Sequence, residues 1–253
     1  MKSNMSSVNF FNEGFFGYSL TQDFYMGSIW HILPIALMIV VIILIYIFRE
    51  KLKNFKYESS VRFILAFVML MAEMSFFWRL LYVGTEGTAS TMMNKLPLQI
   101  CQWGLIICVF TITSKNKNLF GVNYFMTLLF ATIALVYPLV ITTTGPRYFR
   151  YYQFWLEHIL PIISVFYLMF VHDMKPQYKN IFHTWFGLLI LAVLAIIANS
   201  KFEGAYYLYL NINVPVLPTN PIFKVAVLAV VVLAVFHLMY FLFNVVDKRK
   251  RKI

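Results

Sequence analysis

The segment Leu96-Pro97-Leu98-Gln99-Ile100-Cys101-Gln102 opens a long apolar stretch and places a thiol and two amides close to its start. The sequence around it is compatible with hydrocarbon, since 61% of all residues are hydrophobic, 12% are charged and the mean hydropathy is +0.74. A soluble domain has about 25% charged residues. We therefore expect the chain to lie in a membrane, where a polar group inside a helix needs a packing or functional reason.

Seven apolar stretches are long enough to cross a bilayer, because a helical span needs roughly 20 apolar residues. They cover approximately residues 28–48, 61–83, 96–113, 119–142, 152–171, 182–200 and 222–246. The predicted fold is all-α, a polytopic membrane protein with one bundle of seven transmembrane helices over 28–246. Residues 1–27 mix aromatic with polar side chains, which suits an external segment at the headgroup layer. Residues 247–253 form a basic tail.

The cationic residues predict how the bundle is oriented. One set of loops, together with the tail, holds thirteen Lys and Arg residues, and the other set holds five: Lys2, Lys95, Arg147, Arg150 and Lys201. The positive-inside rule then puts the N-terminus outside and the C-terminus in the cytoplasm. The net charge of +11 is explained by this topology and by attraction to anionic lipid, so we expect no nucleic acid as a partner.

A pentapeptide occurs twice, as His31-Ile32-Leu33-Pro34-Ile35 and as His158-Ile159-Leu160-Pro161-Ile162. Both copies fall in the outer half of helices that are predicted to run in the same direction, as a parallel repeat requires. Five residues in so skewed a composition also agree by chance. Proline cannot donate a hydrogen bond to the carbonyl four residues earlier, so each copy leaves one backbone acceptor without its helical partner.

This repeat supports a transporter as one hypothesis for function. Seven spans in a three-plus-one-plus-three arrangement, with helices bent at proline, are the layout of small-solute transporters of the SWEET type. In that interpretation Glu73, Asn123 and Asn199 line a pathway and Cys101 only packs.

Two ionisable residues, Glu73 and Arg79, lie inside the predicted second span. A charge at the bilayer centre costs on the order of 3 kcal/mol on insertion scales, so Glu73 is expected to face the bundle interior and to be paired or protonated. A structural ion pair or a hydrogen bond between helices would satisfy this requirement without any catalytic role.

Cys101 and His158 are predicted to lie at one depth in the bundle. Both predicted helices enter from the outer side, and Cys101 is about 8 Å and His158 about 9 Å along its helix axis from the entry point. A thiol becomes a nucleophile when a neighbouring histidine takes its proton. Cys101, Gly104 and Cys108 also form a small-residue stripe, which is typical of close helix contacts.

A metal site is a further alternative. The side chains of His31, His158, Cys101 and Glu73 are of the right types to bind a transition metal, but their spacing matches no known metal motif. We therefore expect neither a metal nor another cofactor.

Several motifs together resemble the YwaF-type family of bacterial integral membrane proteins. They are the run Glu73-Met74-Ser75-Phe76-Phe77-Trp78-Arg79, the Leu-Pro-Leu-x-x-Cys pattern of residues 96–101, Phe154-Trp155-Leu156-Glu157-His158 and Gly204-Ala205-Tyr206-Tyr207-Leu208-Tyr209-Leu210. The resemblance covers nearly the whole chain, and Leu-Pro-Leu-x-x-Cys is its distinctive part. It implies a multi-pass protein of a bacterial plasma membrane.

The same pattern occurs in a vertebrate relative that acts as a transmembrane acyltransferase in ether-phospholipid synthesis. The resemblance implies Cys101 as nucleophile and His158 as base for moving an acyl chain from a phospholipid to a lysolipid or lipoprotein acceptor. Many members of the family carry histidine where this chain has Gln99, so any chemistry that needs that imidazole is absent here. The remaining residues with an expected supporting or headgroup-binding role are His31, Glu73, Arg79, Gln99, Gln102, Arg147 and Arg150.

Overall fold

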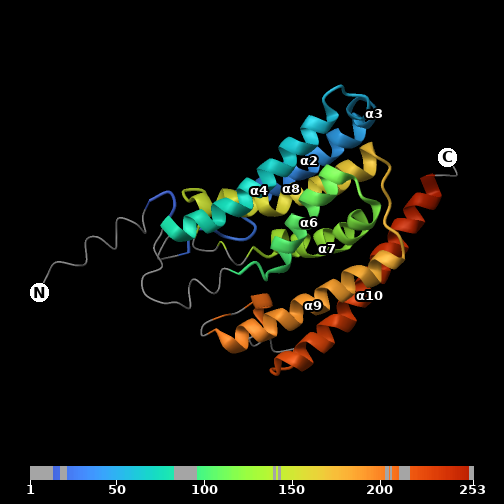
Figure 1. Cartoon of the computed structure of the whole chain (residues 1–253). Helices are drawn as coiled ribbons and strands as arrows, with labels where there is room; N and C mark the ends of the chain where they lie inside the picture. Colours follow the sequence, from blue (N-terminus) through green and yellow to red (C-terminus); the bar gives the residue numbers. More distant parts are fainter. Residues whose placement is uncertain are drawn as a thin grey trace, which may run out of the picture.

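The computed structural model describes residues 14–17, 22–82, 96–138, 141, 144–202, 205, 207–210 and 217–250. Every regular element in these ranges is a helix, which confirms the all-α class (Figure 1). The elements are α2 (Ile29–Ile47), α3 (Arg49–Lys53), α4 (Glu58–Tyr82), α6 (Ile100–Ser114), α7 (Lys117–Val136), α8 (Phe149–Val171), α9 (Lys179–Lys201), the 3₁₀ turn η2 (Tyr207–Tyr209) and α10 (Pro221–Lys250).

Six of these helices are long and apolar enough to cross a bilayer, namely α2, α4, α7, α8, α9 and α10. The third predicted span corresponds to α6, which has 15 residues. At 1.5 Å per residue such a helix is roughly 22 Å long, shorter than the ~30 Å hydrocarbon core. The structure therefore gives six candidate spans and one shorter apolar helix, and the predicted orientation of the termini stays a prediction.

Several predicted helix ends are wrong by a few residues, mostly because of proline. The third span was expected from residue 96, but α6 begins at Ile100, because Gln99 is still extended (φ −86°, ψ 143°). The fourth was expected to reach residue 142, but α7 ends at Val136, since Pro138 disfavours a helical conformation at Tyr137. At the other end of the chain α10 continues to Lys250, into the predicted tail.

Helix α6 lies at the centre of the bundle, in contact with α4, α7 and α8. Helix α2 packs against α8, α9 packs against α7, and α10 lies along α9 (Figure 1). The main apolar core joins α6 and α7 through side chains such as Leu105, Cys108 and Phe125, all of which are fully buried. Helices α2 and α10 bury almost none of their most apolar residues within the protein. Most of their apolar surface therefore faces outward.

Part of the segment predicted to be external is packed into the bundle. Phe24 is 2% exposed and its ring lies against those of His31 and Trp155, at centroid distances of 5.9 and 6.5 Å. Gly145 allows the neighbouring loop to approach, because a Cβ atom there would lie 2.4 Å from the carbonyl oxygen of Asp23. Phe24 therefore packs against the bundle, while residues 1–13 and 18–21 of the segment lie outside the described residues. The external interfacial location of the segment stays a prediction.

Candidate active site

The first turn of α6 is held by hydrogen bonds that reach beyond the helix. The backbone N–H of Gln99 donates to Gln102 Oε1 at 3.3 Å, and Gln99 Oε1 accepts from the backbone N–H of Leu208 at 3.3 Å. The N–H of Leu96 donates to the hydroxyl of Tyr207 at 2.9 Å. These contacts fix Cys101 as the second residue of α6 and bring the turn η2 over this end of the helix.

The turn η2 is itself in a costly conformation. Leu208 and Tyr209 have φ values of 55° and 53°, in the left-handed region that non-glycine residues rarely adopt. Asn199 compensates, because its side chain accepts from the N–H of Tyr207 at 2.8 Å and donates to the carbonyl of Tyr207 at 3.0 Å. The described part of the loop is therefore pinned to both α9 and the start of α6.

Cys101 and His158 line the same small cavity, between α6, α7 and α8. Its volume is about 10 Å³, which is room for roughly one water molecule. Thr127, Phe130 and Glu157 also contribute to its wall. Within the described residues no hydrogen bond joins Cys101 to His158, although both side chains border this cavity.

The hydrogen bonds of His158 determine which nitrogen is basic. Its Nδ1 lies 2.7 Å from the carbonyl oxygen of Phe154. A carbonyl only accepts, so Nδ1 carries the proton and Nε2 has the free electron pair of the neutral ring. His158 is 4% exposed, and this basic nitrogen belongs to a ring that borders the Cys101 cavity.

His31, in the other copy of the pentapeptide, has both ring nitrogens engaged. Its Nδ1 accepts from the N–H of Gly27 at 2.9 Å, and its Nε2 lies 2.8 Å from the carbonyl of Leu135. The backbone acceptor freed by Pro34 is also used, since the hydroxyl of Tyr151 donates to the carbonyl of Trp30 at 2.6 Å. This copy of the pentapeptide therefore connects α2 to α7 and α8 through hydrogen bonds.

Charged and amide groups from α4, α6 and α8 surround Cys101. Glu73 is 5% exposed and its Oε1 accepts from Gln102 Nε2 at 2.9 Å, while its Oε2 has no hydrogen-bond partner among the described residues. On α8, Arg150 Nη1 lies 3.2 Å from Glu157 Oε2. Glu157 also lines the cavity that Cys101 and His158 share.

The sequence analysis missed two members of this group, Gln153 and Glu157. Gln153 Nε2 donates to Glu157 Oε2 at 2.9 Å and to the carbonyl of Ala72 at 3.1 Å, so it ties α8 to α4. Arg150 also donates to the side chain of Gln153. The spacing of residues 150, 153 and 157 was the available signal, because steps of three and four place side chains on one helix face.

The remaining predicted residues are placed as follows. The guanidinium of Arg150 points into the bundle and lies 4.7 Å from the ring centre of Phe76. Arg147, in contrast, is exposed. The side chain of Arg79 lies outside the described residues. No three His, Cys, Asp or Glu side chains in the described part of the chain are arranged to bind a metal ion, and His31 turns to Leu135 rather than to Cys101.

The residues of the transporter hypothesis have local partners. Asn123 is fully buried and accepts from Thr127 Oγ1 at 2.6 Å, and Asn199 supports the backbone of Tyr207. Glu73, as described above, bonds to Gln102. The repeat and the transport pathway stay predictions.

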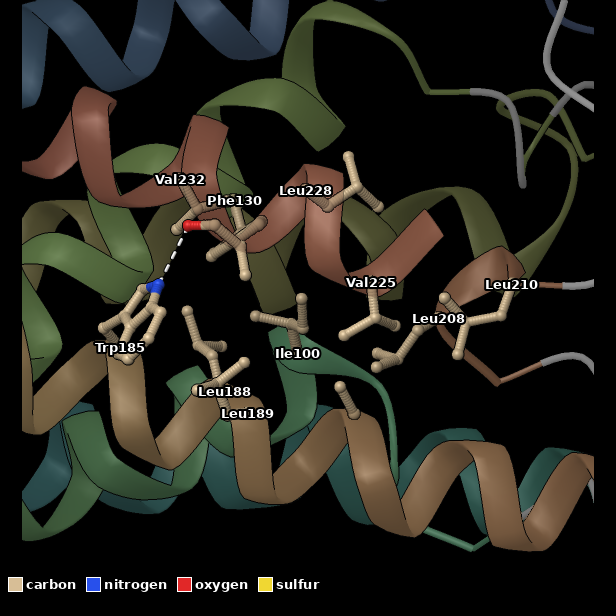
Figure 2. A pocket seen from close by; sticks show the side chains of 12 residues that line it. Ile100, Phe130, Trp185, Leu188, Leu189, Leu208, Leu210, Val225, Leu228 and Val232 are labelled. Carbon is tan, nitrogen blue, oxygen red and sulfur yellow. Dashed lines mark hydrogen bonds between the residues drawn. The ribbon is translucent and has the colours of Figure 1, made fainter. Parts of the chain in front are cut away.

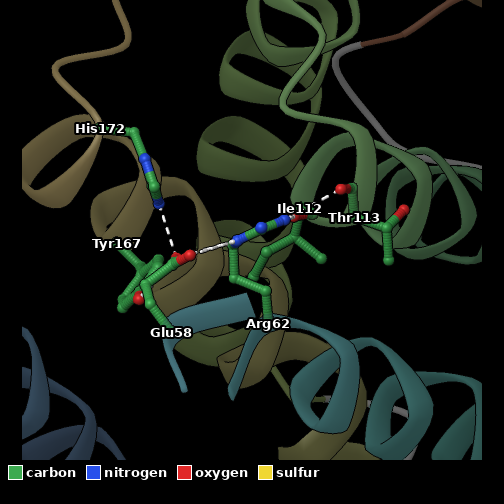
Figure 3. Close-up of polar contacts among 6 residues, drawn as sticks. All are labelled: Glu58, Arg62, Ile112, Thr113, Tyr167 and His172. Atoms are coloured by element: carbon green, nitrogen blue, oxygen red, sulfur yellow. Dashed lines mark hydrogen bonds and ion pairs between the residues drawn. The ribbon is translucent and has the colours of Figure 1, made fainter. Parts of the chain in front are cut away.

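A second polar cluster, which the sequence analysis did not predict, lies at the opposite end of α4 (Figure 3). Arg62 Nε donates to both oxygens of Glu58, at 2.9 and 3.1 Å, and its Nη1 donates to two carbonyls at the end of α6, at 2.7 and 2.9 Å. Glu58 Oε1 also accepts from the hydroxyl of Tyr167 at 2.9 Å and lies 2.7 Å from His172 Nε2. We call these four residues, Glu58, Arg62, Tyr167 and His172, the Glu58 clamp.

These observations define the class of protein. Six long apolar helices, a shorter one at their centre and charges that are paired inside the bundle are the features of a multi-pass helical membrane protein.

Comparison with known families identifies the particular group within that class. The model of the TMEM164 family matches residues 25–241, most of the chain, so the protein belongs to the TMEM164 family. No curated protein and no solved structure matches it. The YwaF-type and bacterial assignments stay predictions.

Proposed function

We propose that this protein is a membrane acyltransferase that carries an acyl chain as a thioester on Cys101 and uses His158 as the base. The observation that carries the proposal is the shared cavity of Cys101 and His158, in which Phe154 orients the imidazole so that Nε2 is the basic nitrogen. A nucleophile and its base must come within hydrogen-bond reach of each other, directly or through one water, and a shared cavity of about that size supports this role for Cys101 and His158.

The proposed reaction has two halves. His158 Nε2 takes the proton from the Cys101 thiol while sulfur attacks the ester carbonyl of a phospholipid. The acyl carbon–oxygen bond breaks, the leaving lysolipid alkoxide receives the proton from His158, and the acyl chain remains on sulfur. An acceptor hydroxyl or amine then attacks the thioester, gives its proton to His158 and releases the thiolate, which takes that proton back.

The start of α6 supplies partial positive charge for this chemistry. The N–H groups of the first turn have no partners within the helix, and the helix dipole favours negative charge at that end. They are better placed as oxyanion donors than Gln102, whose amide already donates to Glu73.

The proposed donor is a phospholipid of the outer leaflet, with a lysolipid or lipoprotein as acceptor. Lipids reach a buried site sideways from the bilayer, and the exposed Arg147 precedes α8 at the end of the bundle that holds Cys101. A guanidinium at that level suits binding of a lipid phosphate.

Trapping the acyl-enzyme tests the proposal. The protein is purified, incubated with a phospholipid that carries an alkyne-tagged acyl chain and analysed by intact mass, with hydroxylamine release to identify a thioester. Wild type is expected to gain one acyl group, and Cys101→Ala and His158→Gln are expected to lose at least 99% of the labelling. Cys108→Ala is the matched control and is expected to label normally. Equal labelling of Cys101→Ala would overturn the assignment.

A further inference from the structure

An apolar pocket near Cys101 lies between α7, α9, α10 and the start of α6 (Figure 2). It has a volume of about 140 Å³, and eleven of the twelve residues that line it are wholly apolar. The exception is Trp185, whose indole N–H donates to the carbonyl of Ala229 at 2.8 Å. No side-chain hydrogen-bonding group of these lining residues is therefore left facing the pocket, which suits a hydrocarbon ligand and not a polar solute.

This pocket adjoins the cavity of the candidate active site. Ile100 and Phe130 line both the apolar pocket and the cavity that holds Cys101 and His158. Ile100 is also the direct chain neighbour of Cys101. The cavity that Cys101 lines and the apolar pocket are therefore direct neighbours, with Ile100 and Phe130 in the wall of both.

The size of the pocket limits how much of a ligand it holds. A dry apolar cavity of about 150 Å³ in another protein takes up benzene, so 140 Å³ accommodates on the order of six carbon atoms. A lipid chain is longer than that, and its remainder would have to lie along the outer surfaces of α9 and α10. Those surfaces are apolar, since Ile190 and Val193 on α9 and Val230 on α10 are more than half exposed.

The turn η2 and the residue after it form one end of the pocket (Figure 2). Leu208 and Leu210 contribute apolar side chains to its wall, while the backbone N–H of Leu208 is bonded to Gln99 at the start of α6. Leu208 has a positive φ of 55°, an unfavourable conformation for a leucine, and its side chain lines the pocket. The same backbone contact therefore fixes both the pocket end and the first turn of α6.

We propose that this pocket binds a segment of a lipid acyl chain and sets the position of its carboxyl end relative to Cys101. The inference rests on the proposed function, because it assigns the pocket to the chain that is transferred. It also makes a separate prediction, since hydrocarbon binding needs no nucleophile and is retained when Cys101 is replaced.

Photo-crosslinking tests the location directly. The full chain, with Cys101→Ser to prevent turnover, is placed in phosphatidylcholine nanodiscs that contain a phospholipid with a diazirine group within its acyl chain. Mass spectrometry then locates the labelled residues. Label is expected on pocket-lining residues of α9 and α10, such as Leu188, Leu189 and Leu228. Label confined to outward residues such as Ile190 and Val230 would overturn the proposal.

A matched pair of substitutions on α10 tests occupancy. Ala229→Phe fills the pocket, whereas Ala226→Phe adds the same side chain at an exposed position one turn earlier. At least a fivefold loss of pocket labelling is expected for Ala229→Phe and none for Ala226→Phe. Equal labelling of the two variants, both checked for a monodisperse elution profile, would contradict the proposal.

The two proposals can fail independently. Pocket labelling without any Cys101 thioester would refute only the catalytic proposal. A Cys101 thioester without pocket labelling would refute only the proposal that the pocket binds the acyl chain.

Discussion

The two polar clusters of the bundle differ in how completely their groups are paired. In the Glu58 clamp, both carboxylate oxygens accept hydrogen bonds and Arg62 is shared between Glu58 and the last carbonyls of α6. Around Cys101, by contrast, Glu73 has one buried oxygen without a partner among the described residues, and Cys101 and His158 both line a water-sized cavity. In the first cluster both carboxylate oxygens are hydrogen-bonded, whereas in the second one carboxylate oxygen can still accept a hydrogen bond.

This difference indicates different roles. A buried charge normally persists only where it is paired, because an unpaired one costs several kcal/mol. The clamp meets that condition and joins α4, α6 and α8, which is a structural task. The cluster around Cys101 leaves a buried carboxylate oxygen unpaired beside the candidate nucleophile and base, which is a cost that packing alone does not explain. This favours a functional role at the Cys101 end.

Removing the central cation of the clamp is expected to have the largest effect on stability. Arg62→Met leaves Glu58 and two helix-end carbonyls without their donor and is predicted to lower the free energy of unfolding by about 3–5 kcal/mol. Titration with SDS in mixed micelles measures this change. A loss below about 1 kcal/mol would show that the clamp is not closed in the membrane-embedded protein.

The two carboxylates provide the sharpest test of the comparison. Glu58→Gln is predicted to cost about 3 kcal/mol, because charge-assisted hydrogen bonds to Arg62 are lost. Glu73→Gln keeps an oxygen that can accept from Gln102 and removes an incompletely paired charge, so its stability is expected to stay within about 1 kcal/mol of wild type. The same SDS titration applies to both. Equal destabilisation by the two changes would make Glu73 a structural residue as well.

The two cysteines are expected to separate stability from function. Cys108 is fully buried in the core between α6 and α7, so Cys108→Ala is predicted to cost about 1 kcal/mol and to leave acyl labelling unchanged. Cys101 is only partly buried, and Cys101→Ala is predicted to change stability by less than about 0.5 kcal/mol while abolishing labelling. The reverse pattern, with labelling lost at Cys108 alone, would exchange the two roles.

The smallest effect is expected for an exposed ion pair. Lys53 donates to Asp173 at 2.9 Å, and this hydrogen bond raises the pKa of Lys53 above its ordinary value of 10.5. The contribution of the pair is therefore fully present below pH 10.5 and lost only as the pH rises through the raised pKa. Lys53→Met is predicted to leave the melting temperature unchanged at every pH from 7 to 9. A measurable change in melting temperature within that pH range would show that even a solvent-exposed ion pair stabilises this protein.

The candidate site was predictable in its chemistry and not in its contacts. The Leu-Pro-Leu-x-x-Cys pattern and the histidine of Phe154–His158 indicated a thiol and an imidazole at one depth. Nothing in the two identical pentapeptides distinguished His158 from His31, because the carbonyls that engage them come from Phe154 in one case and from the distant Leu135 in the other. The Glu58 clamp was missed because its partners are up to 114 residues apart.

The sequence by itself determined the all-helical class and six of the seven predicted spans, because the length of an apolar stretch is a local property. It did not determine the helix ends near Pro97 and Pro138. Only the tertiary structure decided that Cys101 and His158 share a cavity, that Glu73 bonds to Gln102, and that Arg150 turns inward to Glu157. Those contacts depend on how helices rotate and pack against one another, and that rotation is set by the fit of many side chains from distant segments.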